Sequence, residues 1–289
     1  MPSLGDLQRR FGIPGVVQVD SGAGSLPRVV VTGDHASAEI YLHGAHLTKF
    51  QPKGAKPVLF MSGKSWFEAN KPIRGGVPVC FPWFGPKAGS PEVPAHGFAR
   101  IRDWDLDSCV RQPDGAVRVG FVLDSPESAL RLSFTIGRSL EMDFEVRSKA
   151  ALTFEEALHT YFLVGDVRRV GVEGLENTDY LDKTDSFRRK TQPAEPIRIT
   201  AETDRVYLDT RTACVVRDPV LERSILVEKE GSDTTVVWNP WIAKAKAMPD
   251  FGDDEWPEMI CVETANVGDR AVRLQAGETH RMKVRITVS

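Results

Sequence analysis

The feature that most constrains this chain is a two-residue repeat of apolar and polar side chains. Residues 130–136 alternate in this way, and residues 140–146 repeat the pattern after a short link that contains Gly137. Successive side chains of a β-strand point to opposite faces, so the pattern predicts two half-buried strands joined as an antiparallel hairpin. The run from Met282 to Val288 alternates in the same way.

Further hairpins are expected where glycine separates two strand-like runs. The runs 29–32 and 37–42 form one such pair, and the runs 224–230 and 234–238, on either side of Gly231, form another. Glycine favours the tight turns that such connections need. The chain is therefore predicted to be built mainly from short antiparallel strands.

Helical signals are confined to short stretches at 4–11 and 243–248, and Pro249 and Pro257 limit anything longer there. Strands and helices do not alternate regularly, as they would in a doubly wound α/β sheet. The fold class is therefore expected to be all-β, a large antiparallel sandwich with few short helices. No repeat or Pro/Ser-rich linker divides the chain, so we expect a single domain over residues 1–289.

Charge and composition narrow the class of partner. The chain has 37 Lys and Arg against 40 Asp and Glu, a net charge of −3, which offers no general attraction for nucleic acid or anionic lipid. No apolar run reaches membrane-spanning length and the first residues show no secretion signal, so a cytoplasmic protein is expected. Four cysteines without a CxxC pair are expected to be buried thiols: Cys80, Cys109, Cys214 and Cys261.

Two segments interrupt the alternation with prolines, glycines and cationic side chains. In segment 71–86, Arg74 precedes two glycines, and a guanidinium on such a bend can bind a phosphate or a carboxylate. In segment 95–100, His96 and Arg100 flank a small turn and could converge on an anion or a sugar hydroxyl. The alternatives are an Arg paired with a structural acid and an ordinary surface loop.

Two more segments place polar residues in apolar surroundings. His159 lies within an apparent strand over 155–162, where it could donate a proton or serve as a hydrogen-bonded core histidine. Glu263 lies in an otherwise apolar strand and must be paired or functional, because burying a lone carboxylate is costly. Trp238 and Trp241 flank Asn-Pro and could form a sugar-binding platform or belong to the core.

Together these segments resemble the hexose-6-phosphate mutarotase branch of the aldose 1-epimerase family. The matching pieces, in family order, are PIRGGVPVCFPWFGP at 72–86, HGFAR at 96–100, LHTYF at 158–162, ETDRVY at 202–207 and VWNPWIAKAKAMPDFGDDEWPEMICVETAN at 237–266. The resemblance implies the β-supersandwich of galactose mutarotases, with large antiparallel sheets and a concave sugar-binding face. Ala95 departs from the glutamine that some members carry, so a side-chain contact to the sugar is lost.

The resemblance also implies roles for individual residues. It makes His159 and Glu263 catalytic, and it assigns contacts with the substrate to Arg74, Arg100, Asp204 and, within the same pocket motif, His96. Interconverting two anomers requires a base at the C1 hydroxyl and an acid at the ring oxygen. Glu263 is expected to be the base and His159 the acid, with the nearby carboxylate favouring a protonated imidazole.

The expected partner is a small-molecule hexose 6-phosphate, held through its phosphate by the two arginines. The chemistry needs no metal, nucleotide or redox cofactor, and the family suggests a monomer. Two other functions remain open: a general aldose 1-epimerase acting on free sugars, and a sugar-phosphate binding protein without turnover. A structural sandwich without a ligand is a third alternative.

Overall fold

The computed structural model describes residues 2–87, 89–90 and 92–289 and contains four antiparallel sheets. Sheet I holds four strands in chain order. They are β1 (Val17–Ser21), β2 (Pro27–Thr32), β3 (Ala36–Tyr41) and β4 (His46–Pro52). The predicted pairing of runs 29–32 and 37–42 is confirmed, because β2 and β3 form a hairpin. A small two-stranded sheet joins β10 (Leu152–Phe154) to β21 (Val272–Leu274).

Sheet III is an eight-stranded sheet made largely from the alternating runs. Its strands, in spatial order, are β13 (Gly171–Glu173), β17 (Cys214–Asp218), β18 (Arg223–Glu230), β22 (Thr279–Val288), β9 (Leu140–Ser148), β8 (Ser128–Ile136), β7 (Val117–Asp124) and β6 (Asp105–Arg111). The predicted hairpin is the β8–β9 pair, in which Ile136 lies opposite Leu140. Its apolar residues are buried in the core, which confirms the faces assigned from the alternation.

Sheet II, also eight-stranded, carries the residues singled out above. Its main path is β15 (Arg188–Thr191), β14 (Asp179–Asp182), β16 (Thr203–Leu208), β19 (Thr234–Asn239), β20 (Met259–Asn266), β11 (Glu156–Leu158) and β5 (Val79–Cys80), and β12 (Tyr161–Leu163) also pairs with β20. All positions of β19 and β20 are buried, as expected of central strands covered on both faces.

The expected hairpin across Gly231 is wrong. Both strands exist, but β18 pairs with β17 and β22 in sheet III, whereas β19 pairs with β16 and β20 in sheet II. Gly231 (φ 68°) carries the chain from one sheet to the other, and a Cβ there would lie 2.0 Å from the carbonyl oxygen of Arg281. The glycine is therefore needed for a close approach to β22 as well as for the turn.

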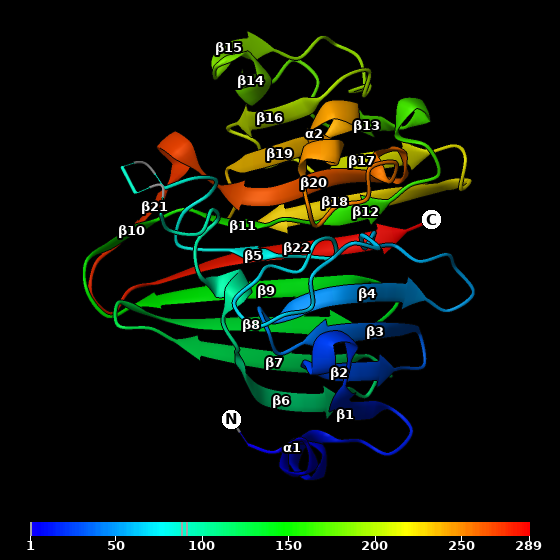
Figure 1. The fold of residues 1–289 in the computed structure, drawn as a ribbon, viewed down its shortest axis with the longest axis vertical. Helices are drawn as coiled ribbons and strands as arrows, with labels where there is room; N and C mark the ends of the chain where they lie inside the picture. Colours follow the sequence, from blue (N-terminus) through cyan, green and yellow to red (C-terminus); the bar gives the residue numbers. More distant parts are fainter. Residues whose placement is uncertain (1, 88, 91) are drawn as a thin grey trace.

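The two short helices lie outside the sheets, as predicted (Figure 1). Helix α1 (Leu4–Phe11) begins with a capping box between Ser3 and Asp6 and buries Leu7 and Phe11. Helix α2 (Trp241–Ala247) begins two residues earlier than its periodicity indicated. In Figure 1 α1 and the β14–β15 hairpin lie at opposite ends of the long axis.

One large hydrophobic cluster includes residues of sheets I, II and III, from Leu7 near the start of the chain to Ile286 in β22. No helix among the described residues is long and apolar enough to span a bilayer. The four cysteines are free thiols, three of them buried, whereas Cys109 is only half-buried.

Candidate active site

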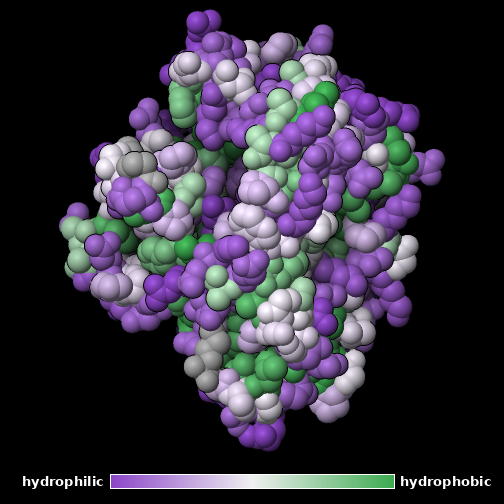
Figure 2. All heavy atoms as spheres, viewed as in Figure 1, coloured by the Kyte–Doolittle hydropathy of each residue, from purple (hydrophilic) through white to green (hydrophobic). Residues whose placement is uncertain are grey.

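Six of the seven predicted site residues line one cavity of about 270 Å³ on sheet II. They are Arg74, His96, Arg100, His159, Asp204 and Glu263. They come from separate loops and strands, so the fold brings together residues that are far apart in the sequence. Figure 2 shows this face of the molecule hollowed beside α2, with hydrophilic side chains inside the hollow.

His159 lies at a break between two strands, not in the middle of one continuous strand as predicted. Strand β11 ends at Leu158 and β12 begins at Tyr161. The Thr160 N–H donates to the Leu158 carbonyl at 2.9 Å, which makes a three-residue turn centred on His159. The His159 N–H donates to Pro78 O at 3.0 Å, so the turn is tied to the proline-rich segment.

Glu263 faces His159 across the sheet. Leu158 lies opposite Thr264 in β20, and Tyr161 lies opposite Cys261, so the same register on both sides of the break places His159 opposite Glu263. The His159 Nε2 lies 3.4 Å from Glu263 Oε1. The side chain of Glu263 is 1% exposed, and neither of its oxygens has a hydrogen-bond partner within the described part of the chain.

The surroundings of this pair shift the pKa values of both residues against the expected carboxylate and imidazolium. Burial and the charges of Arg74, Arg100 and Lys183 hold the pKa of His159 well below 6.5. Burial and the charge of Asp204 raise the pKa of Glu263 well above 4.5. Both shifts disfavour the charged form of the residue concerned, so the surroundings oppose the carboxylate and the imidazolium alike.

Arg74 is oriented by the carboxylate of Asp250, so it is paired with a structural acid, as one interpretation of its segment proposed. Its guanidinium donates to both oxygens of Asp250, at 3.1 and 3.3 Å, and to the hydroxyl of Tyr161 at 3.0 Å. The two glycines after Arg74 have positive φ, and a Cβ on Gly76 would lie 2.2 Å from Leu47 O. Arg74 still lines the cavity, and two of its five N–H donors remain for a ligand.

His96 and Arg100 present hydrogen-bond donors to the same cavity. The Gly85 N–H donates to His96 Nδ1 at 3.3 Å, so that nitrogen is an acceptor and the proton of the neutral ring is on Nε2. Burial and the charge of Arg100 hold the pKa of His96 well below 6.5. Arg100 donates from Nη2 to Ala95 O at 2.7 Å, and its buried Nε has no partner among the described residues.

Asp204 is paired with a lysine that the sequence analysis missed. Lys183 follows β14 and its Nζ lies 2.9 Å from Asp204 Oδ2, whereas Asp204 Oδ1 is buried without a described partner. Both residues line the cavity. No motif or spacing singles out Lys183, because its position depends on the pairing of β14 with β16.

Trp241 is not among the residues that line the cavity. Its ring packs against Trp256, with 4.2 Å between the ring centroids, whereas Trp238 lines the cavity and packs edge-on against His159. Trp238 belongs to β19, and Trp241 begins α2 beyond Pro240. Of the two tryptophans considered for an aromatic platform, Trp238 therefore lines the cavity and Trp241 does not.

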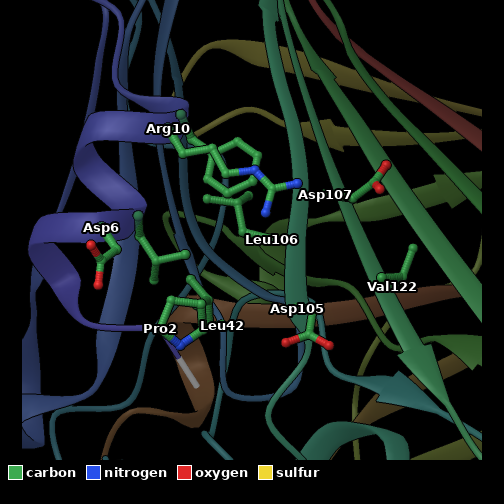
Figure 3. A pocket seen from close by; sticks show the side chains of 10 residues that line it. Pro2, Asp6, Arg10, Leu42, Asp105, Leu106, Asp107 and Val122 are labelled. Carbon is green, nitrogen blue, oxygen red and sulfur yellow. The ribbon is translucent and has the colours of Figure 1, made fainter.

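A separate hollow of about 360 Å³ lies between α1 and β6 (Figure 3). Arg10 extends from α1 toward β6, and Asp105 and Asp107 of β6 are also among the lining residues. The lining contains no histidine or cysteine. It therefore offers no counterpart to the acid–base pair of sheet II.

The fold and the cavity define a class: an antiparallel β-sandwich protein with a buried acid–base pair in a cation-lined pocket. Residues 27–287 match the family described as Aldose 1-epimerase. The chain belongs to the aldose 1-epimerase family, and the protein is accordingly an epimerase.

Individual relatives agree with the family. A protein from Cenchrus ciliaris described as "Putative glucose-6-phosphate 1-epimerase" is 36% identical, covering 94% of this chain and 87% of the relative. The crystal structure of YeaD, "a putative mutarotase" from Salmonella typhimurium, has a TM-score of 0.89 at 31% identity and covers 96% and 95% of the two chains. A galactose 1-epimerase from Lactobacillus acidophilus shares the fold, with a TM-score of 0.70 at 14% identity and coverage of 91% and 94%.

Proposed function

We propose that the protein interconverts the α and β anomers of hexose 6-phosphates, with glucose 6-phosphate as the first candidate substrate. The observation that carries the proposal is the buried His159–Glu263 pair in a pocket lined by Arg74, Arg100 and Lys183. In this pair His159 Nδ1 and both carboxyl oxygens of Glu263 have no hydrogen-bond partner among the described residues. An acid–base pair supplies the chemistry, and the cations suit a phosphate. The descriptions of the relatives point to the same substrate.

The pair holds one acid and one base whichever member carries the proton. One residue takes the proton of the C1 hydroxyl while the other protonates the ring oxygen, and ring closure on the opposite face of the aldehyde reverses both transfers. The pair regains its starting proton after each turnover. Ring opening and closure therefore involve no net exchange with an external acid or base.

The phosphate of the substrate would also change the pKa values of His159 and Glu263. Three cations lower the pKa of His159, and a bound dianion beside them would offset their charge. Arg100 has no carboxylate partner in the described ion pairs, and Lys183 can exchange Asp204 for a phosphate oxygen. Binding would then favour the imidazolium and carboxylate forms that the ring-opening step was first expected to use.

The test is exchange NMR on freshly dissolved α-glucose 6-phosphate, with free glucose measured in parallel. We expect fast exchange of the phosphosugar alone, abolished by His159→Ala and retained by His35→Ala, a histidine that does not line the cavity. Equal acceleration of glucose would assign a general aldose 1-epimerase. Binding without acceleration of either sugar would leave a sugar-phosphate binding protein and contradict the proposal.

We also propose that residues 1–289 act as a single domain and as a cytoplasmic monomer without a nucleic-acid or membrane partner. The continuous hydrophobic cluster supports the single domain. Light scattering during gel filtration tests the monomer. A dimer at working concentrations would contradict it.

A further inference from the structure

A thiol lies beside the acid–base pair and has no part in the proposed proton transfers. Cys261 is fully buried and lies two residues before Glu263 in β20, so both side chains point to the same face of sheet II. His159 reaches that face from the neighbouring strand break, opposite Glu263. One ligand atom from each residue can be chosen so that all three lie within 4.8 Å of one another.

These three groups are ligands that zinc prefers. Zn²⁺ binds thiolate, imidazole and carboxylate, and sites with three protein ligands keep an open position for water. Tetrahedral bonds of about 2.0–2.3 Å place ligand atoms roughly 3.3–3.8 Å apart, so the ligand atoms would have to approach one another by up to about 1–1.5 Å when the ion binds.

The buried polar atoms at this place point to a missing partner. His159 Nδ1 and both oxygens of Glu263 are buried and have no hydrogen-bond partner among the described residues, although the two side chains are only 8% and 1% exposed. Buried polar groups are normally satisfied, so atoms left open in this way mark a binding position. A metal ion can bind the lone pairs of the same nitrogen and oxygen atoms that would accept hydrogen bonds from a sugar.

The charge of such a site is balanced locally. The Cys261 thiolate and the Glu263 carboxylate together carry two negative charges and would neutralise a divalent cation. The cations Arg74 and Lys183 are already paired with Asp250 and Asp204, whereas Arg100 has no carboxylate partner in the described ion pairs and its charge opposes the ion. Binding releases the protons of the two acidic ligands, so it should become tighter as the pH rises.

We propose that His159, Cys261 and Glu263 form a binding site for Zn²⁺, and that Zn²⁺ inhibits the enzyme by occupying its acid–base pair. The inhibition rests on the proposed function, whereas the binding does not. The ion would be a reversible inhibitor: no step of the reaction uses it. A chelator should therefore restore full activity.

The binding test uses the untagged full chain, because a histidine tag would itself bind metal. Co²⁺ reports thiolate coordination by a sulfur-to-cobalt charge-transfer band, and Zn²⁺ affinity is measured by competition with a chromophoric chelator. We expect one equivalent to bind. Cys261→Ser should remove the band and weaken Zn²⁺ by roughly tenfold or more, since even loss of an outer partner of a metal ligand costs about 10–100-fold.

Matched variants identify the ligands. Cys80→Ser changes a buried thiol that contacts His96, and Cys214→Ser changes a buried thiol in sheet III; both should keep the band. Glu263→Gln should bind Zn²⁺ more weakly, which can be measured even though this variant is expected to lack anomerisation activity. Cys261→Ala takes the place of Cys261→Ser if the serine variant misfolds. Absence of stoichiometric binding, or binding unchanged in both Cys261 variants, would overturn the proposal.

The inhibition test is separate. Zn²⁺ should block anomerisation by the wild type, EDTA should restore it, and Cys261→Ser should remain active and largely resistant. Zinc that binds through Cys261 without slowing turnover would overturn the inhibitory half. Failure of the proposed function would be visible independently, as absence of metal-free anomerisation in a protein that still binds Co²⁺ through sulfur.

Discussion

Sheets II and III both carry polar side chains on a face that points away from the core, and they treat them in opposite ways. On sheet III, charged residues lie opposite one another in register and form ion pairs, such as Arg285 with Glu141 at 2.6 Å and Lys283 with Glu230 at 3.3 Å. In the cavity over sheet II, Arg100, His159, Asp204 and Glu263 are buried and each keeps a polar atom without a partner among the described residues.

The difference shows how a sheet face becomes a binding site. Cross-strand pairing satisfies charges on an exposed face at little cost and specifies little beyond register. Leaving buried polar atoms open costs stability, and the cost is recovered when a ligand supplies the missing partners. Equivalent substitutions on the two sheets should therefore have very different consequences.

The largest contrast is expected for a carboxylate changed to an amide. Glu263→Gln should lower kcat/KM for glucose 6-phosphate by about 10²–10⁴-fold, because an amide cannot exchange the proton. Glu141→Gln on sheet III should leave it unchanged. The Glu263→Gln variant should also be at least as stable as the wild type in thermal unfolding, since an amide of the same shape cannot become a buried charge. Equal kcat/KM in the Glu263→Gln and Glu141→Gln variants would contradict the proposed difference between the two sheets.

Arg74 should show that pairing within the cavity is obligatory. Its guanidinium is the partner of Asp250, whose side chain is 3% exposed. Arg74→Ala should lower the free energy of unfolding by about 3–5 kcal/mol, because the buried carboxylate loses its partner. Urea unfolding of this variant and of Arg74→Ala/Asp250→Asn separates the causes: the double variant should recover part of the loss.

Arg100 should affect substrate binding more than folding, because it has no carboxylate partner in the described ion pairs. Arg100→Ala should raise KM for glucose 6-phosphate by about 10- to 150-fold, the equivalent of one charge-assisted hydrogen bond of about 1.5–3 kcal/mol. Arg285→Ala is the matched control on sheet III and should leave KM unchanged. If KM for free glucose rose as much as KM for the phosphosugar, Arg100 would have no role at the phosphate.

A smaller effect is expected from a pair that joins the two sheets. His280 of β22 lies 2.8 Å from the buried Glu156 of β11. Burial acts to lower the pKa of His280, but the hydrogen bond to Glu156 and its charge outweigh burial and raise it above 6.5. The stabilisation is therefore complete below pH 6.5 and is lost as the pH rises through the higher folded-state pKa.

Urea unfolding of the wild type and of His280→Gln at pH 5.5 and pH 9 measures this dependence. The difference in unfolding free energy between the two proteins should be larger at pH 5.5. A difference that does not change with pH would show that His280 contributes only through packing.

The smallest effect is expected for the exposed ion pairs of sheet III. A double-mutant cycle on Arg285→Gln and Glu141→Gln should give a coupling energy of about 0–1 kcal/mol, because both side chains are largely in water. Raising the salt concentration should reduce it further. A coupling of several kcal/mol would mean that the two faces differ less than their burial indicates.

The alternation of side chains predicts strands and their faces, but not the sheet to which a strand belongs. It gave the β8–β9 hairpin with the correct inner face, because local pairing and the turn are adjacent in the sequence. It failed across Gly231, where two correct strands pair with distant partners in different sheets. The difference in burial between β18, which alternates, and β19, which is buried throughout, reflects that separation.

The cavity residues that lie in recognisable sequence motifs could be predicted from the sequence. Arg74, His96 and Arg100 lie in segments whose glycines and prolines break the strand pattern, and those residues do line the cavity. The position of Lys183, and the presence of Trp238 but not Trp241 in the lining, depend on the pairing of strands far apart in sequence, which no local pattern contains. The proton of the pair depends on the sum of surrounding charges, so it could be assessed only in three dimensions.

Because β22 lies in the middle of sheet III but is synthesised after all its neighbours, its position affects how the nascent chain behaves. Strand β9 ends at Ser148, but its partner β22 begins only at Thr279, and the same strand completes the pairing of β18. A nascent chain emerging from the ribosome therefore carries two unpaired strand edges, on β9 and β18, until β22 appears. Such edges are templates for pairing with other chains, so premature termination before β22 should yield aggregates in place of a smaller working enzyme.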